Sequence, residues 1–226
     1  MKRYTTLSER LSAFENSDVY PVISSEFCAH REELFILEEV LKGGAKTVQI
    51  REKHLDDKRL LVLLKKAREI TGHYGALLIV NDRVDLALAS GADGVHLGQD
   101  DMPLEDALKI APELLIGTST HNLHELKEAQ RNGCGYLNIG PVFPTGTKTL
   151  AMNNLGTAEL KKLIPEVSVP FSVMGGIKFH HLEELRSLGV KHVAAVTAFT
   201  SAADPAAEIR KWKLLLNPQN PDSSAG

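Results

Sequence analysis

Three side chains near residue 50 could together bind a polyanion. In the stretch "QIREK", Gln49, Arg51 and Lys53 occupy alternating positions, so they share one face while the chain stays extended. One amide and two cations on a single face suit a ligand that carries several negative charges. The alternative is an exposed strand end whose charges are simply solvated.

The loop "GPVFPTGTKT", residues 140–149, follows an apolar stretch and gathers hydroxyls, a glycine and a lysine in a short span. A surface turn needs glycine and proline, but it does not need Thr145, Thr147 and Lys148 together. We interpret the loop as one wall of a phosphate site, with a solvated turn as the alternative.

Acidic and amide side chains follow two further apolar runs. Asn81 and Asp82 come directly after one run, and Asp100 and Asp101 come shortly after the next. If the two runs are neighbouring parallel strands, their carboxylates could hold a hard cation between them. Magnesium fits, because it is commonly bound by one or two carboxylates, waters and phosphate oxygens. Two alternatives stay open: Asp82 could cap the following helix, and Asp100 and Asp101 could form an acidic turn.

Small hydroxyls and glycines mark further places where an anion could bind. Ser119 and Thr120 precede a predicted helix, where hydroxyls either cap the helix or bind phosphate together with its free amides. Gly175 and Gly176 could let backbone amides approach an anion closely, although a tight turn would also explain them. Thr197 ends the last apolar run. These neutral groups suit a monophosphate.

A recurring joint predicts how these groups are positioned. The stretches "GGAKTVQI", "SGADGVHL", "NGCGYLNI" and "LGVKHVAA" each contain a glycine that can end a helix, followed by an apolar run typical of a strand. Extending this search predicts strands at 19–24, 46–51, 76–80, 93–97, 114–118, 136–140, 170–174 and 192–197. Amphipathic stretches alternate with them and predict helices at 31–42, 56–71, 82–90, 103–111, 122–132, 157–164, 180–188 and 204–216.

Alternating strands and helices favour parallel pairing, since each helix must return the chain to the same edge of the sheet. Eight such units can close into a single (β/α)8 TIM barrel, an α/β fold that leaves no sheet edge exposed. An open doubly wound sheet is the alternative, but no G-x-G-x-x-G motif follows the first predicted strand. In a barrel, catalytic groups lie past the C-terminal ends of the strands. The candidate residues fall at those positions.

Composition narrows the class of protein. The chain has 226 residues, of which 43% are hydrophobic and 24% charged, as is ordinary for a globular protein with one α/β barrel. A net charge of -3 gives no reason to expect a nucleic acid or an anionic membrane as partner. No apolar run approaches the ~18 residues of a membrane helix. We expect a cytoplasmic protein in which Cys28 and Cys134 are reduced.

Three segments are expected along the chain. Residues 1–18 form a short N-terminal extension, in which apolar residues recur at helical spacing and predict a short helix. Residues 19–216 form the barrel, which is the catalytic domain. Residues 217–226 are expected to be a disordered tail, since they are rich in proline and polar residues. The sequence leaves open whether the protein forms a homo-oligomer.

The sequence resembles the thiamine-phosphate synthase family, also called thiamine-phosphate pyrophosphorylase. The resemblance rests on five motifs in order: "QIREK", "NDRVDLALASGADGVHLGQDD", "GTSTH", "GPVFPTGTKT" and "MGGI". The resemblance covers residues 19–213. It implies a transferase of thiamine biosynthesis that joins 4-amino-5-hydroxymethyl-2-methylpyrimidine diphosphate to a thiazole phosphate. The products would be thiamine monophosphate and pyrophosphate, and the cofactor would be Mg²⁺. The mechanism would be dissociative, with the diphosphate leaving before the thiazole attacks.

The resemblance also assigns the candidate residues to ligands. The pyrimidine diphosphate would be bound by Gln49, Arg51, Lys53, Asn81, Ser119 and Lys148, and the catalytic groups among them would be Arg51, Lys53 and Lys148. Magnesium would be bound by Asp82 and Asp101. The thiazole phosphate would be bound by Thr145, Thr147, Gly176, Val196 and Thr197. The sequence after the eighth predicted strand departs from the family, because a threonine replaces the usual serine and keeps its hydroxyl.

Two other functions are kept as alternatives. One is a thiazole tautomerase-like barrel that uses a histidine such as His121, and the other is a non-catalytic barrel that binds thiamine phosphates. A tautomerase needs no metal, so the presence of Asp82, Asp101 and Lys53 argues against it. The complete cationic and acidic sets also disfavour a binding protein. His96 alternates with apolar residues and is expected inside the barrel rather than in a catalytic role.

Overall fold

Eight parallel strands form the centre of the protein. The structure is a computed structural model that describes residues 4–146 and 154–218. The strands pair in sequence order, and the last pairs with the first to close the barrel. They are β1 (Val19–Ile23), β2 (Thr47–Ile50), β3 (Leu77–Asn81), β4 (Gly94–Leu97), β5 (Leu115–Thr120), β6 (Tyr136–Ile139), β7 (Phe171–Val173) and β8 (His192–Ala195). The predicted (β/α)8 TIM barrel is confirmed, and the open-sheet alternative is wrong.

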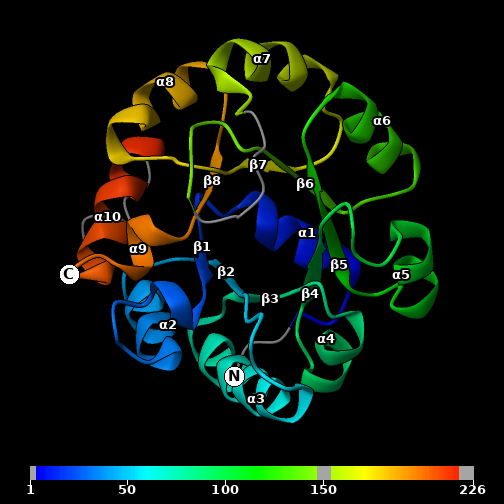
Figure 1. Ribbon diagram of the computed structural model, residues 1–226, viewed down its shortest axis with the longest axis vertical. Coiled ribbons are helices and arrows are strands. Elements are labelled where there is room, and N and C mark those ends of the chain that lie inside the picture. The colour runs from blue at the N-terminus through cyan, green and yellow to red at the C-terminus, as the bar shows by residue number, and fades with distance from the viewer. Residues whose placement is uncertain (1–3, 147–153, 219–226) are drawn as a thin grey trace.

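Helices surround the strands (Figure 1). They are α2 (Glu33–Lys42), α3 (Asp57–Tyr74), α4 (Val84–Ser90), α5 (Leu104–Ile110), α6 (Leu123–Arg131), α7 (Gly156–Leu163), α8 (Leu182–Ser187) and α10 (Pro205–Leu216). Shorter elements are α9 (Thr197–Thr200) and the 3-10 turns η1 (Ser25–Phe27), η2 (Ile164–Glu166) and η3 (Phe179–His181). Over 4–146 and 154–218, no helix has the length and apolar character required to cross a bilayer.

The predicted glycine joints work as helix ends. Gly91, in one of the predicted joints, ends α4, and Gly75 ends α3 in the same way, each in the left-handed conformation that glycine adopts without steric cost. Both backbone N–H groups return to carbonyls of the last helical turn, so each helix ends sharply and the next strand starts within a few residues. Some predicted features lie outside the described residues: Thr147, Lys148, residues 1–3 of the N-terminal extension and the part of the tail beyond residue 218.

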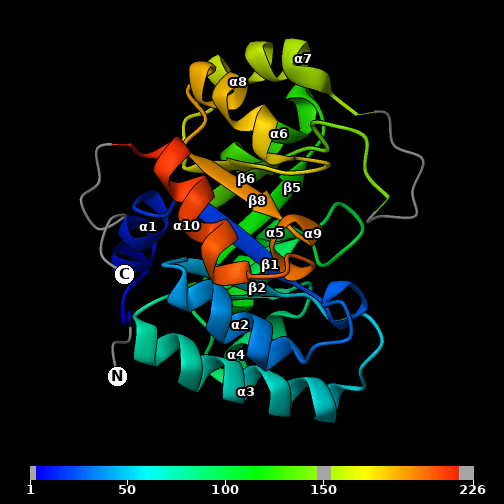
Figure 2. The ribbon, with the colours of Figure 1, turned by 90° about the vertical axis from the view of Figure 1, so that its left-hand side faces the viewer.

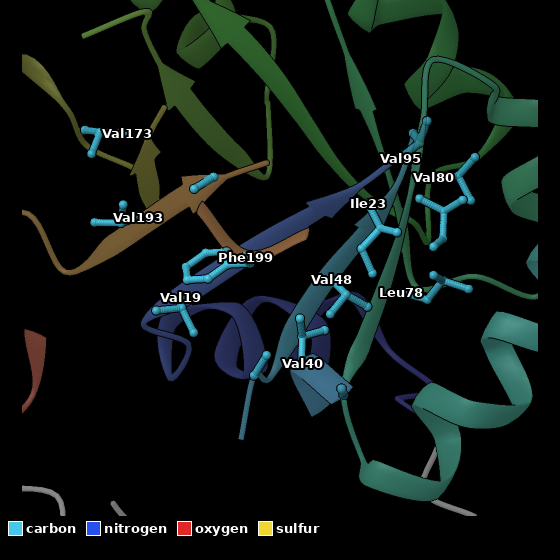
Figure 3. Close-up of a cluster of buried hydrophobic side chains, with 14 of the residues drawn as sticks. Val19, Ile23, Val40, Val48, Leu78, Val80, Val95, Val173, Val193 and Phe199 are labelled. Carbon is cyan, nitrogen blue, oxygen red and sulfur yellow. The ribbon is translucent and has the colours of Figure 1, made fainter. Parts of the chain in front are cut away.

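Branched apolar side chains fill the layer between the strands and the helices. Figure 3 shows part of this buried cluster, which includes Val19, Ile23, Val40, Val48, Leu78, Val80, Val95, Val173, Val193 and Phe199. Helices cover the outer face of every strand while side chains fill the lumen, so the strands are buried on both faces. Parallel strands of this kind therefore read as continuous apolar runs, which is the pattern the sequence carries.

A second, smaller core fills the barrel lumen and is closed by the N-terminal helix α1 (Leu7–Glu15). Phe14 of α1 is 1% exposed; its ring stacks on that of Tyr136 at 4.3 Å and meets that of Tyr20 edge-on at 6.0 Å. Ahead of the helix, the Tyr4 hydroxyl donates to the Gly75 carbonyl at 2.7 Å. Figure 2 shows α1 at one end of the barrel and α9, which follows β8, at the other. Helix α1 therefore covers the N-terminal end of the strands.

A buried ion pair joins the helical layer to the strands at the same end. Arg68 of α3 is 4% exposed and Asp93, just before β4, is 2% exposed. The Arg68 guanidinium donates to the Asp93 carboxylate, which also accepts the Leu78 N–H at 2.9 Å. Arg10 of α1 lies 4.0 Å from the second carboxylate oxygen. Asp93 thus connects three elements through one carboxylate.

Candidate active site

The C-terminal ends of the strands gather the predicted groups at the end of the barrel opposite α1. Gln49 lies on β2, Asn81 ends β3 and Ser119 lies on β5. The alternating pattern predicted that the strand continues through Arg51 and Lys53. Strand β2 instead ends at Ile50, so both cations lie on the following loop. Parallel strands in a closed barrel bring all these positions to one rim.

The loop after β2 is held in place by the glutamate between the two cations. Glu52 accepts hydrogen bonds from the Ser25 N–H at 2.5 Å and from the Ser25 hydroxyl at 2.7 Å. The Arg51 N–H donates to the Ile23 carbonyl at 2.8 Å and extends the backbone pairing of β1 and β2. Lys53 then reaches across to the loop after β3, where its ammonium group donates to Asp82. Glu52 therefore anchors the stretch that carries both cations.

Asp82 and Asp101 are electrostatic neighbours at this rim, on the stretches that follow β3 and β4. Burial, followed by the neighbouring Asp101, raises the pKa of Asp82 above its usual value, and Lys53 opposes this rise. The Lys53 side chain is 45% exposed, so its charge is partly screened by water. Two crowded carboxylates and one partly solvated cation leave a local excess of negative charge.

The backbone around both aspartates explains their positions. Asp82 has a φ of 62°, a left-handed conformation that aspartate tolerates better than most residues, and its N–H donates to the His96 carbonyl at 2.9 Å. Helix α4 starts two residues later with Arg83 as its N-cap, so the interpretation of Asp82 as a helix cap is wrong. Asp101 accepts the Gly98 N–H at 2.7 Å, and a Cβ at Gly98 would lie only 2.9 Å from that oxygen.

The donor set at this pair suits magnesium. No group of three or more His, Cys, Asp or Glu side chains that could hold a metal occurs in the described part of the chain, so the protein would supply two carboxylates. Mg²⁺ commonly takes one or two carboxylates and fills its remaining positions with waters and phosphate oxygens. A divalent cation would also neutralise the charge that raises the pKa of Asp82. Asp82 and Asp101 therefore fit such an ion.

A chain of buried hydrogen bonds links Gln49 to Ser119 through the barrel lumen. The Gln49 amide donates to the Tyr20 hydroxyl at 2.7 Å, and this hydroxyl lies 2.9 Å from that of Tyr136. The Tyr136 hydroxyl lies 3.1 Å from Nδ1 of His96, and Nε2 of the same ring lies 2.9 Å from the Ser119 hydroxyl. The predicted interior position of His96 is confirmed, since it is buried on β4. Its contact with Ser119 was not predicted.

The hydroxyls at the end of β5 do not cap α6, whereas His121 on the following loop is tied to the start of that helix. Ser119 and Thr120 belong to β5, and α6 is capped by Asn122, so the cap interpretation of the two hydroxyls is wrong. His121 is tied to α6, because its Nδ1 lies 2.8 Å from Oε2 of Glu125 and its backbone N–H donates to the same oxygen. This ring is held as part of the helix start.

The loops after β6 and β7 pack directly on each other. The N–H groups of Val142 and Phe143 donate to the carbonyls of Met174 and Gly175 at 2.8 and 2.9 Å. Gly176 has a φ of 62°, and a Cβ there would lie 2.8 Å from the Phe143 carbonyl oxygen. The glycine pair is thus required by a tight turn and by the close approach of the two loops. Thr145, further along the first loop, is exposed.

Short helix α9 follows β8 almost directly. The apolar run 192–197 did not reveal where the strand ends and this helix begins. Strand β8 ends at Ala195, and Thr197 is the first residue of α9. Val196 and Thr197 are half-buried. The Thr200 hydroxyl donates to the Phe27 carbonyl at 2.8 Å and holds α9 against the loop after β1. Thr197 is therefore placed at the rim next to β1.

Comparisons with known proteins agree on one family. A family model described as thiamine monophosphate synthase matches residues 19–199. The chain is 43% identical over 187 residues to the thiamine-phosphate synthase of Archaeoglobus fulgidus, covering 83% of this chain and 87% of that protein. It is 35% identical over 208 residues to the thiamine-phosphate synthase of Pelotomaculum thermopropionicum, covering 92% of this chain and 95% of that protein.

A solved structure agrees with these sequence matches. The thiamine phosphate pyrophosphorylase of Pyrococcus furiosus superposes with a TM-score of 0.84 at 34% sequence identity, covering 91% of this chain and 98% of that one. A 3-hexulose-6-phosphate synthase superposes with a TM-score of 0.63 at 16% identity, which reflects the fold alone.

Proposed function

The chain belongs to the thiamine monophosphate synthase family and is a transferase of thiamine biosynthesis, and on that premise we propose which residues bind each substrate and how they act. The pyrimidine diphosphate would lie across the rim from β2 to β5. Among the residues that the structure describes, its proposed contacts are Gln49, Arg51, Lys53, Asn81 and Ser119. The support is geometric, since these residues end or follow neighbouring strands of one barrel. Lys148, outside the described residues, is proposed as a further diphosphate contact from the sequence resemblance.

Asp82 and Asp101 are proposed to hold Mg²⁺ beside the diphosphate. The bound ion would neutralise negative charge on the diphosphate and make it a better leaving group. Arg51 and Lys53 act on the same charge from the loop after β2, and Lys53 already lies next to Asp82. Charge stabilisation at the leaving group is commonly the largest contribution that a protein makes to such a reaction.

The proposed chemistry requires no nucleophile from the protein. The bond between the pyrimidine methylene carbon and the diphosphate oxygen breaks, and the electron pair leaves with the diphosphate. The ring amino group stabilises the resulting cation. The thiazole nitrogen then donates its lone pair to the methylene carbon and forms the new C–N bond. Holding the two substrates in line supplies most of the remaining rate enhancement.

The thiazole phosphate is proposed to bind at the opposite part of the rim. Among the residues that the structure describes, its proposed contacts are Thr145, Gly176, Val196 and Thr197. Thr147 is added from the sequence resemblance. Supporting this placement, the loops after β6 and β7 are hydrogen-bonded to each other, and α9, which carries Thr197, is tied to the loop after β1. Neutral hydroxyls and amides suit a monophosphate that stays bound throughout the reaction.

The observation that carries this proposal is the cluster of Lys53, Asp82 and Asp101 at the barrel rim. We expect purified protein, incubated with both substrates and Mg²⁺, to release thiamine monophosphate and pyrophosphate in equal amounts. Omitting either substrate or chelating the metal should stop both products. Rapid product formation in the presence of excess chelator would contradict the metal proposal. Conversion of a thiazole phosphate without the pyrimidine substrate would favour the tautomerase alternative.

Thr197→Val should raise the KM for the thiazole phosphate about fivefold, because one neutral hydrogen bond contributes roughly 1 kcal/mol. Valine keeps the shape of threonine and removes its hydroxyl, so the KM for the pyrimidine diphosphate should not change. Steady-state kinetics with each substrate varied in turn measures both constants. Ser201→Ala is the matched control, since that hydroxyl donates to the Phe27 carbonyl nearby. An equal rise in both KM values for Thr197→Val would show that the two phosphate sites are wrongly assigned.

We further propose that residues 19–216 form the catalytic domain, with 1–18 as an extension, and that the protein acts in the cytoplasm on phosphorylated small molecules. The contact of α1 with the barrel lumen supports treating the extension as part of the same folded unit. The protein could act as a monomer or as a homo-oligomer, and size-exclusion chromatography with light scattering would distinguish the two.

A further inference from the structure

The lumen chain, defined as Gln49, Tyr20, Tyr136, His96 and Ser119, joins two residues that we propose to contact the pyrimidine diphosphate. Its two ends come from β2 and β5, and its three inner members come from β1, β6 and β4. Every link is between 2.7 and 3.1 Å. Burial raises the pKa of both tyrosines, so both hydroxyls keep their protons.

With a neutral His96 ring, the protons of the lumen chain can be arranged so that each donor points to the next member. The Gln49 amide donates to Tyr20, so the single Tyr20 proton points to the Tyr136 oxygen. The Tyr136 proton then points to Nδ1 of His96, which must be the unprotonated nitrogen. A neutral ring in that state carries its proton on Nε2 and donates it to the Ser119 oxygen. The Ser119 hydroxyl is left to donate its own proton outward, to a ligand oxygen at the rim.

The middle of the lumen chain depends on the N-terminal helix. The Tyr136 ring lies across the lumen over Gly117, where a Cβ would collide with it, and Phe14 of α1 stacks on it at 4.3 Å with an interplanar angle of 30°. Phe14 also contacts the Tyr20 ring. Phe14 therefore touches both tyrosines that carry the proton arrangement, although it lies at the opposite end of the barrel from the rim.

We propose that helix α1 is a positioning element of the active site, in which Phe14 holds the Tyr136 ring so that the lumen chain orients the Ser119 hydroxyl as a donor to the pyrimidine diphosphate. This inference rests on the proposed function, which assigns Gln49 and Ser119 to that substrate. It extends the functional part of the chain to a residue that touches no substrate.

Tyr136→Phe removes the central hydroxyl and keeps the ring that Phe14 contacts. We expect this variant to raise the KM for the pyrimidine diphosphate about fivefold, the size of one neutral hydrogen bond, and to leave the KM for the thiazole phosphate unchanged. Phe14→Leu, which keeps apolar volume but removes the stacked ring, should give the same selective rise, about threefold. In the Tyr136→Phe background, Phe14→Leu should add almost nothing, because the hydroxyl it positions is gone.

A spectroscopic measurement tests the same inference without turnover. In protein labelled with ¹⁵N-histidine, the resonances of His96, assigned by their loss in a His96→Gln variant, should report a ring protonated at Nε2. This preference should weaken in both Tyr136→Phe and Phe14→Leu. A ring protonated at Nδ1 in the unsubstituted protein would overturn the proton arrangement and, with it, the inference.

Controls separate this inference from general destabilisation and from the substrate assignment. Leu126→Ala opens the outer core under α6, away from the lumen, and should lower stability while changing neither KM. Ser119→Ala should raise the pyrimidine KM by itself. If Ser119→Ala has that effect and Phe14→Leu does not, the role of α1 is wrong and the substrate assignment stands. If Ser119→Ala has no effect, both the assignment and the inference built on it are wrong.

Discussion

Asp82→Asn should lower kcat by at least about a thousandfold at saturating Mg²⁺, equivalent to roughly 4 kcal/mol in the activation barrier. Asparagine has nearly the same size as aspartate and is also tolerated at a φ of 62°, so the backbone should not change. What is lost is one of two carboxylates that we propose to hold the metal. Kinetics over a range of Mg²⁺ concentrations would measure the effect on kcat and on metal affinity.

Melting temperatures of the same variant give an independent readout. Because the folded state raises the pKa of Asp82, ionisation of this group above that pKa costs stability. Asparagine removes that cost, so the melting temperature without metal at neutral pH should not fall, while stabilisation by Mg²⁺ should be lost. Asp100→Asn is the matched control, since Asp100 is an exposed neighbour and should leave kcat within about twofold. Activity near that of the unsubstituted enzyme for Asp82→Asn would contradict the metal site.

Asp93→Ala should lower the free energy of unfolding by about 3–5 kcal/mol, because it leaves the buried Arg68 guanidinium without its carboxylate. It also removes the acceptor of the Leu78 N–H and the carboxylate near Arg10 of α1. Urea unfolding followed by circular dichroism would measure the change. The effect is on stability, and the remaining folded protein should bind both substrates normally.

Two further variants show whether the isolated charge is the cause. Asp85→Ala removes an ion pair with Arg83 whose side chains are largely in contact with solvent, and it should cost below about 0.5 kcal/mol. Replacing both partners, Arg68→Met with Asp93→Ala, should recover most of the loss because no unpaired charge stays buried. A loss below about 1 kcal/mol for Asp93→Ala would mean that water reaches Arg68 once the carboxylate is gone.

The barrel was predictable because its signals are local. Each strand is an apolar run a few residues long, and a glycine such as Gly75 or Gly91 marks the helix end before it, so short windows of sequence contain the information. Strand boundaries agree with the structure within about two residues, but a helix that follows a strand without a turn residue leaves no local signal. Helix α9 was missed for that reason, since Val196 and Thr197 continue the apolar run of β8 without any turn residue.

The candidate site was predictable only as a set of positions. Knowing that strand ends converge placed Asp82, Asp101 and Lys53 at one rim, and the structure brings these three together. The sequence could not show that Asp82 takes a left-handed conformation or that Lys53 lies beyond the strand. The lumen chain was hidden as well, because Tyr20 and Tyr136 are 116 residues apart and nothing in their local sequence marks them as partners.

The position of Phe14 has a consequence for the order in which the chain is made. A ribosome releases α1 before any strand, yet the pocket for Phe14 is built from residues on β1, β3, β5, β6 and β8. The helix therefore cannot bury Phe14 until these strands have assembled, although it precedes all of them in the chain. Contacts between such distant residues slow folding, because each must overcome the entropy of closing a long loop.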